Sequence, residues 1–110
     1  MILPIAQYPF KGPLRSIKKI ENSPGVFAVI CEFVEKYYLL DVDHSDDVKK
    51  SILNHERRKC WEKYRKGLIR YAVLYENNFS SDSKEEIEKK IRYKYRTIPC
   101  GSNDHFISKV

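Results

Sequence analysis

The stretch at residues 26–33 reads VFAVICEF, a nearly continuous apolar run rich in β-branched and aromatic side chains. Such a run is typical of a strand that is buried on both faces. Residues 23–25, Ser-Pro-Gly, break the chain just before it. A second apolar run at residues 37–42 follows after only three residues, so the two runs are predicted to pair as an antiparallel hairpin.

A helix is predicted to follow this hairpin. Ser45 is a good N-cap candidate, and the acidic residues 46 and 47 would then occupy the first turn, where the helix dipole favours negative charge. The predicted inner face of this helix is formed by residues at spacing i, i+4, i+7, namely Val48, Ile52 and His55. The sequence leaves open whether one helix continues through Trp61 or breaks near His55, and Gly67 is the predicted end.

Two further elements complete the predicted domain. Residues 69–75, IRYAVLY, alternate as a third strand does, and residues 84–96 carry an apolar stripe at helical spacing formed by Ile87, Ile91 and Tyr95. Residues 1–22 contain three prolines and are predicted to form an irregular arm that packs on the domain. The expected fold is α+β, a three-stranded antiparallel sheet flanked by helices in the order β-β-α-β-α, with a domain at residues 23–103 and a tail at 104–110.

Positive charge is concentrated in one segment. The 110 residues carry a net charge of +6, and residues 49–70 hold nine basic against two acidic side chains. A polyanion is the natural partner of such a segment, although a solvated helix face gives the same pattern. The residues predicted to contact nucleic acid are Lys49, Lys50, Arg57, Arg58, Lys59, Lys63, Arg65 and Lys66.

The cysteines and the hydropathy bear on location. Cys31, Cys60 and Cys100 are odd in number and widely separated, so they cannot all pair within the chain, which favours a reducing cytoplasm. Together with the histidines they form no paired ligand spacing of the kind that structural zinc sites use. No apolar run approaches the roughly 20 residues needed to span a bilayer, and we expect no membrane partner.

The predicted order of elements, and the residues at its corners, resemble the GIY-YIG nuclease domain. Residues 25–27, Gly-Val-Phe, stand where that family has Gly-Ile-Tyr. The second motif falls on residues 38–40 or, in the gapless register that we favour, on residues 41–43. His55 matches a histidine that is frequent in the family, and Glu88, followed by an apolar residue and a basic run, resembles the family's closing helix.

This resemblance implies a metal-dependent endonuclease. Glu88 would hold Mg²⁺ or Mn²⁺, while His55 and either Tyr38 or Asp41 would handle protons. The implied partner is DNA rather than RNA. Two departures from the family pattern leave a catalytically inactive nucleic-acid-binding module, or a protein-interaction domain, as alternatives: Phe27 lacks a tyrosine hydroxyl, and Ser51 stands in place of an arginine.

Each candidate residue also has a purely structural interpretation. Glu88 lies four residues before Arg92, a spacing typical of a surface ion pair. His55 is equally consistent with a half-buried histidine, and Tyr38 with a residue on the face of the sheet. Trp61 and Tyr64 could stack on bases or be buried against the sheet.

Overall fold

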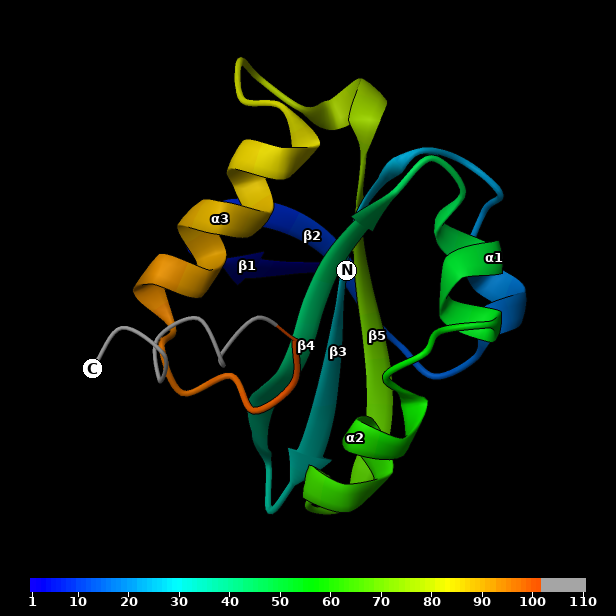
Figure 1. Cartoon of the computed structure of the whole chain (residues 1–110), viewed down its shortest axis with the longest axis vertical. Helices are drawn as coiled ribbons and strands as arrows, with labels where there is room; N and C mark the ends of the chain where they lie inside the picture. Colours follow the sequence, from blue (N-terminus) through cyan, green and yellow to red (C-terminus); the bar gives the residue numbers. More distant parts are fainter. Residues whose placement is uncertain (102–110) are drawn as a thin grey trace.

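A computed structural model describes residues 1–101 and contains a five-stranded sheet in the order β1-β2-β5-β3-β4, in which every neighbouring pair is antiparallel (Figure 1). The strands are β1 (Ile2–Ile5), β2 (Tyr8–Leu14), β3 (Gly25–Phe33), β4 (Lys36–Ser45) and β5 (Leu68–Tyr75). The helices are α1 (Val48–Leu53), α2 (Arg58–Tyr64) and α3 (Lys84–Lys94), with 3₁₀ turns at Ile17–Lys19 and Glu76–Asn78. The class α+β is therefore confirmed.

The prediction of a three-stranded sheet is wrong, because the N-terminal segment forms β1 and β2 instead of an irregular arm. Two of its three prolines lie where a strand tolerates them: Pro4 is on the edge strand β1, and Pro13 follows a cis peptide bond where the β2–β5 register is irregular. Pro9 lies opposite Pro4 in β2, before the residues of β2 that pair with β5. The connecting turn places Ala6 and Gln7 at positive φ. Because such turns usually contain Asn-Gly or a similar pair, the sequence carries no hairpin signal here.

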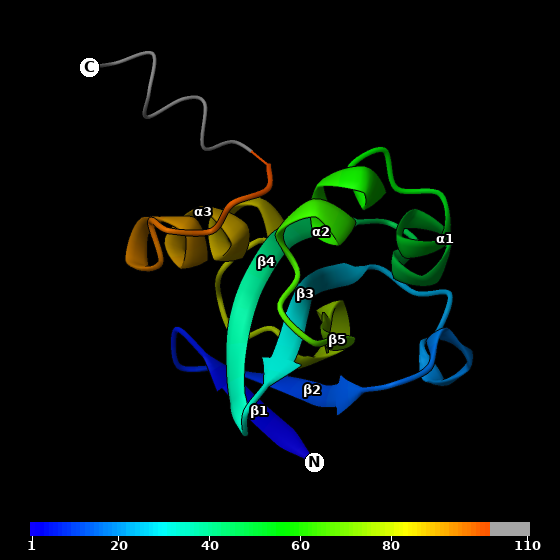
Figure 2. The same cartoon turned by 90° about the horizontal axis from the view of Figure 1, so that it is seen from below.

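The three predicted strands are confirmed as the other part of the sheet, with β3 between β4 and β5. Alternate residues of these strands face opposite sides, so the sheet has two cores. On one face Phe27 packs with Ile52 and Trp61 from α1 and α2, and on the other Val26 packs with Ile87 from α3. Figure 2 shows α1 and α2 on one side of the sheet and α3 on the other.

The helical region between β4 and β5 is broken in two, which settles the question that the sequence left open. The prediction of Ser45 as N-cap is wrong, because Ser45 still belongs to β4. The N-cap of α1 is Asp47, whose side chain accepts a hydrogen bond from the backbone N–H of Lys50. The predicted helix at residues 84–96 is confirmed for Lys84–Lys94 and begins with a capping box formed by Ser83 and Glu86. The predicted tail at 104–110 lies outside the described residues.

A disulfide joins Cys60 in α2 to Cys100 in the segment after α3. Cys31 is a free, buried thiol. The odd cysteine count therefore allows one bond and one leftover thiol, and it does not indicate that all three are reduced. Among residues 1–101, no helix has the length and apolar character needed to cross a membrane.

Candidate functional site

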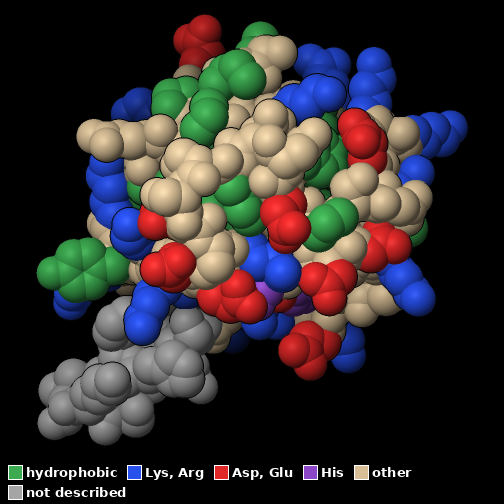
Figure 3. All heavy atoms as spheres, turned by 90° about the horizontal axis from the view of Figure 1, so that it is seen from above, with side chains coloured by type: hydrophobic (Ala, Val, Ile, Leu, Met, Phe, Trp, Pro, Cys, Tyr) green, Lys and Arg blue, Asp and Glu red, His purple; other side chains and the backbone are tan. Residues whose placement is uncertain are grey.

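Charged side chains from three elements meet at the C-terminal half of β4, the edge strand of the sheet. We call this group the β4 cluster; its members are Asp41, Asp43 and His44 from β4, His55 and Arg57 from the α1–α2 connection, and Glu88 and Arg92 from α3. On the face shown in Figure 3, histidine side chains (purple) reach the surface between acidic (red) and basic (blue) groups. Part of the cluster is therefore accessible from solvent.

Asp41 is the buried centre of the cluster, with 0% of its surface exposed. Its carboxylate accepts hydrogen bonds from Arg57 Nε at 2.8 Å, Arg92 Nη2 at 2.8 Å and the indole Nε1 of Trp61 at 2.8 Å. These donors satisfy and neutralise the carboxylate. Asp41 is one of the residues that the sequence nominated for proton transfer. Its burial and its three donors give it a structural role.

His55 holds Asp43 in place. Its Nε2 lies 2.8 Å from Asp43 Oδ2, and its Nδ1 accepts a hydrogen bond from the backbone N–H of Arg57 at 3.1 Å. A nitrogen that accepts from an N–H carries no proton, so Nε2 carries the proton and donates to Asp43. The ring of Phe27 packs edge-on against His55, whose side chain is only 5% exposed.

The carboxylate of Asp43 is held in its charged form. Burial alone would raise the pKa of Asp43, but hydrogen bonds from His55 and from the backbone of His44, together with the charge of Arg57, hold it below its usual value. Asp43 is 25% exposed on its side chain. It therefore presents a stable negative charge at the accessible side of the cluster.

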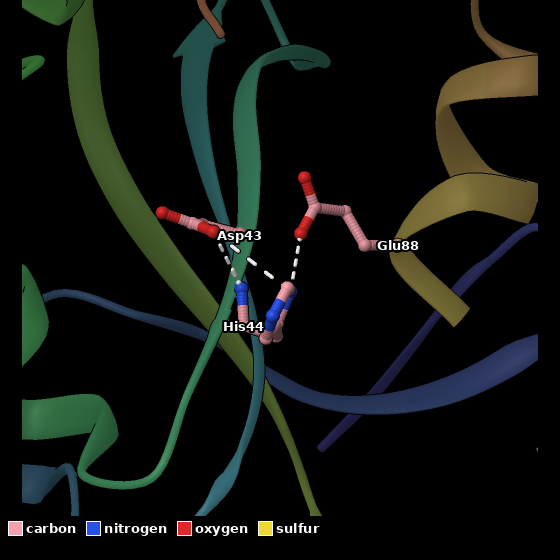
Figure 4. A group of neighbouring side chains, drawn as sticks. All are labelled: Asp43, His44 and Glu88. Atoms are coloured by element: carbon pink, nitrogen blue, oxygen red, sulfur yellow. Dashed lines mark hydrogen bonds and ion pairs between the residues drawn. The ribbon is translucent and has the colours of Figure 1, made fainter. Parts of the chain in front are cut away.

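His44 and Glu88 form the second accessible pair, and their side chains point toward one another from β4 and α3 in Figure 4. His44 Nδ1 lies 2.6 Å from Glu88 Oε1, and Arg92 Nε donates to Glu88 Oε2 at 3.0 Å. Within residues 1–101, Nε2 of His44 makes no hydrogen bond. Arg92 thus orients Glu88 from the buried side, while His44 keeps one ring nitrogen available.

Asp43, His44 and Glu88 could together hold a metal ion. One ligand atom from each lies within 4.8 Å of the others. An imidazole combined with two carboxylates suits Mn²⁺ and similar transition metals better than Mg²⁺, which prefers oxygen ligands.

The β4 cluster as a whole is negatively charged. Its three carboxylates and two arginines give a formal charge of −1 when both histidines are neutral. A bound cation would offset this charge, whereas a phosphate alone would be repelled.

The remaining catalytic candidates from the sequence lie partly inside and partly outside the β4 cluster. The structure brings Glu88 and His55 into one cluster, but Tyr38 lies five residues before Asp43 on β4, a separation of roughly 16 Å at 3.3 Å per residue. Tyr38 lines a separate pocket with Tyr64 and Lys66. Ser51, half-buried in α1, supplies no cation.

The predicted cationic surface follows α1, α2 and the loop after them. Arg57 is committed to the β4 cluster, and Arg58 donates to the carbonyl of Ile52 while its guanidinium lies over Trp61. Arg65 pairs with Glu62. The remaining predicted lysines are exposed or half-buried: Lys49, Lys50, Lys59, Lys63 and Lys66.

Sequence reasoning missed His44, Asp43 and Arg92 as members of the site. A signal was present, because two aspartates alternate along a predicted strand and are followed at once by a histidine. β4 lies at the edge of the sheet, where side chains from the α1–α2 connection and from α3 reach it. The strand order that puts β4 there cannot be read from one sequence.

No family model matches the chain, and neither curated proteins nor solved structures provide a significant match.

Proposed function

We propose that this protein binds nucleic acid through the cationic surface of α1 and α2 and cleaves phosphodiester bonds with a divalent cation held by Asp43, His44 and Glu88. The observation that carries the proposal is the convergence of these three ligand groups at an accessible edge of the sheet, beside a segment of charge +7. The resemblance to GIY-YIG nucleases, which also assigns a metal to Glu88, adds support.

The charge of the site explains why a cation would be needed. The β4 cluster is formally negative, so a phosphodiester could approach only if that charge were offset. A divalent cation acts as a Lewis acid toward a phosphate oxygen when it is bound. The chain's own groups hold the ligands in place: Arg92 fixes Glu88, and His55 fixes Asp43.

The choice of metal and the choice of nucleic acid rest on different grounds. The imidazole of His44 favours Mn²⁺ over Mg²⁺. DNA is proposed ahead of RNA on the family resemblance alone. The sequence favoured a cytoplasmic location because the number of cysteines is odd. The Cys60–Cys100 disulfide instead favours an oxidising compartment, where such bonds persist.

A second candidate function is a nucleic-acid-binding module without turnover. It is favoured by the state of the predicted proton-transfer groups, because Asp41 is buried and paired and both ring nitrogens of His55 are engaged. Such a module would show salt-dependent binding, with each neutralised phosphate contributing slightly less than one unit of log–log slope. It would show no cleavage with any divalent cation.

A cleavage assay separates these functions. Purified protein is incubated with labelled single- and double-stranded DNA and RNA in Mn²⁺, Mg²⁺ or EDTA. We expect cleavage with Mn²⁺, a loss of about 100-fold in Glu88→Gln, and little change in the matched control Glu85→Gln, an exposed residue on the same helix. Full activity in Glu88→Gln would contradict the assignment of the site, and salt-dependent binding without cleavage would support the second candidate.

A further inference from the structure

A second surface, near the opposite end of β4, carries features of a binding site. A pocket of about 480 Å³ opens there, a volume within the range of small-ligand sites. Its apolar floor includes Ile30, Leu40 and Ile98. Its rim includes Tyr38 from β4, Tyr64 from the end of α2, and Lys66. The pocket is therefore apolar inside and aromatic and cationic at its mouth.

The tyrosines at the rim are exposed. Tyr38 and Tyr64 have 42% and 45% of their surface accessible, and their hydroxyls make no hydrogen bond within residues 1–101. Aromatic rings of this kind dominate the energetics of binding sites when a flat apolar partner covers them. The neighbouring Tyr37, also 45% exposed, lines the pocket as well.

Lysines accompany these rings. Lys66 Nζ lies 5.9 Å from the ring centroid of Tyr38, and Lys63 Nζ lies 5.3 Å from that of Tyr64. Both lysines belong to the cationic segment at residues 49–70. No carboxylate lines this pocket among the described residues, so the charge at its mouth attracts an anion. The ligand that fits has a flat aromatic ring, which can stack on the tyrosines, and a negative charge close to that ring, which can meet the lysines.

We infer that this tyrosine pocket, rimmed by Tyr38, Tyr64 and Lys66, binds unpaired bases of single-stranded nucleic acid. Every base has a π-face that can stack on tyrosine, and its own backbone phosphate can meet a lysine. Bases inside a duplex are stacked on one another and cannot enter such a pocket. The inference rests on the proposed function and adds to it the class of substrate, namely a strand with exposed bases.

The position of the pocket sets the length of nucleic acid that can reach both surfaces. Tyr38 and Asp43 are roughly 16 Å apart along β4. A stacked strand advances about 3.4 Å per nucleotide, so about five stacked nucleotides cover this distance, and an unstacked strand needs fewer. A mononucleotide should engage only one of the two surfaces.

The test measures binding in EDTA, so that cleavage does not enter. Fluorescence anisotropy compares a single-stranded oligonucleotide, the same oligonucleotide with abasic positions, and a duplex. We expect Tyr38→Ala and Tyr64→Ala each to weaken binding of the base-containing strand about tenfold and to leave abasic binding almost unchanged, since the charges are identical. The matched control is Tyr93→Ala, an exposed tyrosine of α3 that lies under Arg96 and outside the pocket.

The failures of the two proposals are distinguishable. Equal losses on the base-containing and abasic strands, or none in either tyrosine variant, would overturn the pocket assignment while binding to nucleic acid persists. Absence of binding to every nucleic acid at low salt would overturn the proposed function and the pocket together. If Tyr38→Ala instead converted a dimer to a monomer in light scattering with unchanged affinity, the pocket would be an interface between copies, contrary to the inference.

Discussion

Replacing Asp41 with asparagine is expected to lower the free energy of unfolding by about 3–5 kcal/mol. The carboxylate is fully buried and is the common acceptor for Arg57, Arg92 and the indole of Trp61. An amide removes the negative charge that Arg57 and Arg92 share and places an NH₂ group among donors, while Arg92, itself 7% exposed, keeps only its ion pair with Glu88. Removing the buried acceptor of such an ion-pair network is among the larger single-residue costs in proteins.

The measurement is urea denaturation followed by circular dichroism, with the variant's free energy of unfolding compared with that of the wild type. Asp46→Asn is the matched control, because Asp46 pairs with Lys84 while 93% of its side chain is exposed. The control should change stability by less than about 0.5 kcal/mol. A change of similar size in both variants would contradict the structural role of Asp41 and return it to the candidates for proton transfer.

Loss of the Cys60–Cys100 disulfide is expected to cost about 4 kcal/mol, because the bond closes a loop between residues 40 positions apart. It also attaches the segment after α3 to the site. The backbone N–H of Cys100 donates to the carbonyl of Leu40, and its carbonyl accepts from Arg92 Nη1. The neighbouring Gly101, at φ +105°, lies so close to the Arg92 guanidinium that a side chain there would collide with it.

The double variant Cys60→Ser/Cys100→Ser provides the measurement, by urea denaturation with and without a reductant. The wild type should lose stability when reduced, and the double variant should be equally unstable in both conditions. Because Cys31 is present in both proteins, it serves as an internal control for effects of reductant on a free thiol. Unchanged stability of the reduced wild type would show that the bond contributes nothing to the fold.

Periodic patterns of apolar residues in the sequence predicted three of the elements correctly. The apolar run at 26–33, the alternation at 69–75 and the helical stripe at 84–96 correspond to β3, β5 and α3. The hairpin of β1 and β2 was missed because its turn uses Ala6 and Gln7 at positive φ, and because its prolines look like strand breakers. Pro4 and Pro13 are tolerated because of an edge position and a register irregularity, which are properties of the sheet.

The candidate site was predicted in part for the same physical reason. Glu88 and His55 were identified by family resemblance and belong to one cluster. The burial of Asp41 depends on Arg57 and Arg92, which lie 16 and 51 residues away. His44 joins Glu88 across 44 residues. Contacts over such separations follow from strand order and helix placement, which a single sequence without relatives does not encode in any local pattern.

The proposed divalent-cation site of Asp43, His44 and Glu88 is tested most directly by a crystal soaked in Mn²⁺. Anomalous diffraction should place a peak between these three side chains, and the peak should be absent from Glu88→Gln and present in Glu85→Gln. Density for Mn²⁺ elsewhere, or no peak in the wild type at millimolar Mn²⁺, would contradict the account.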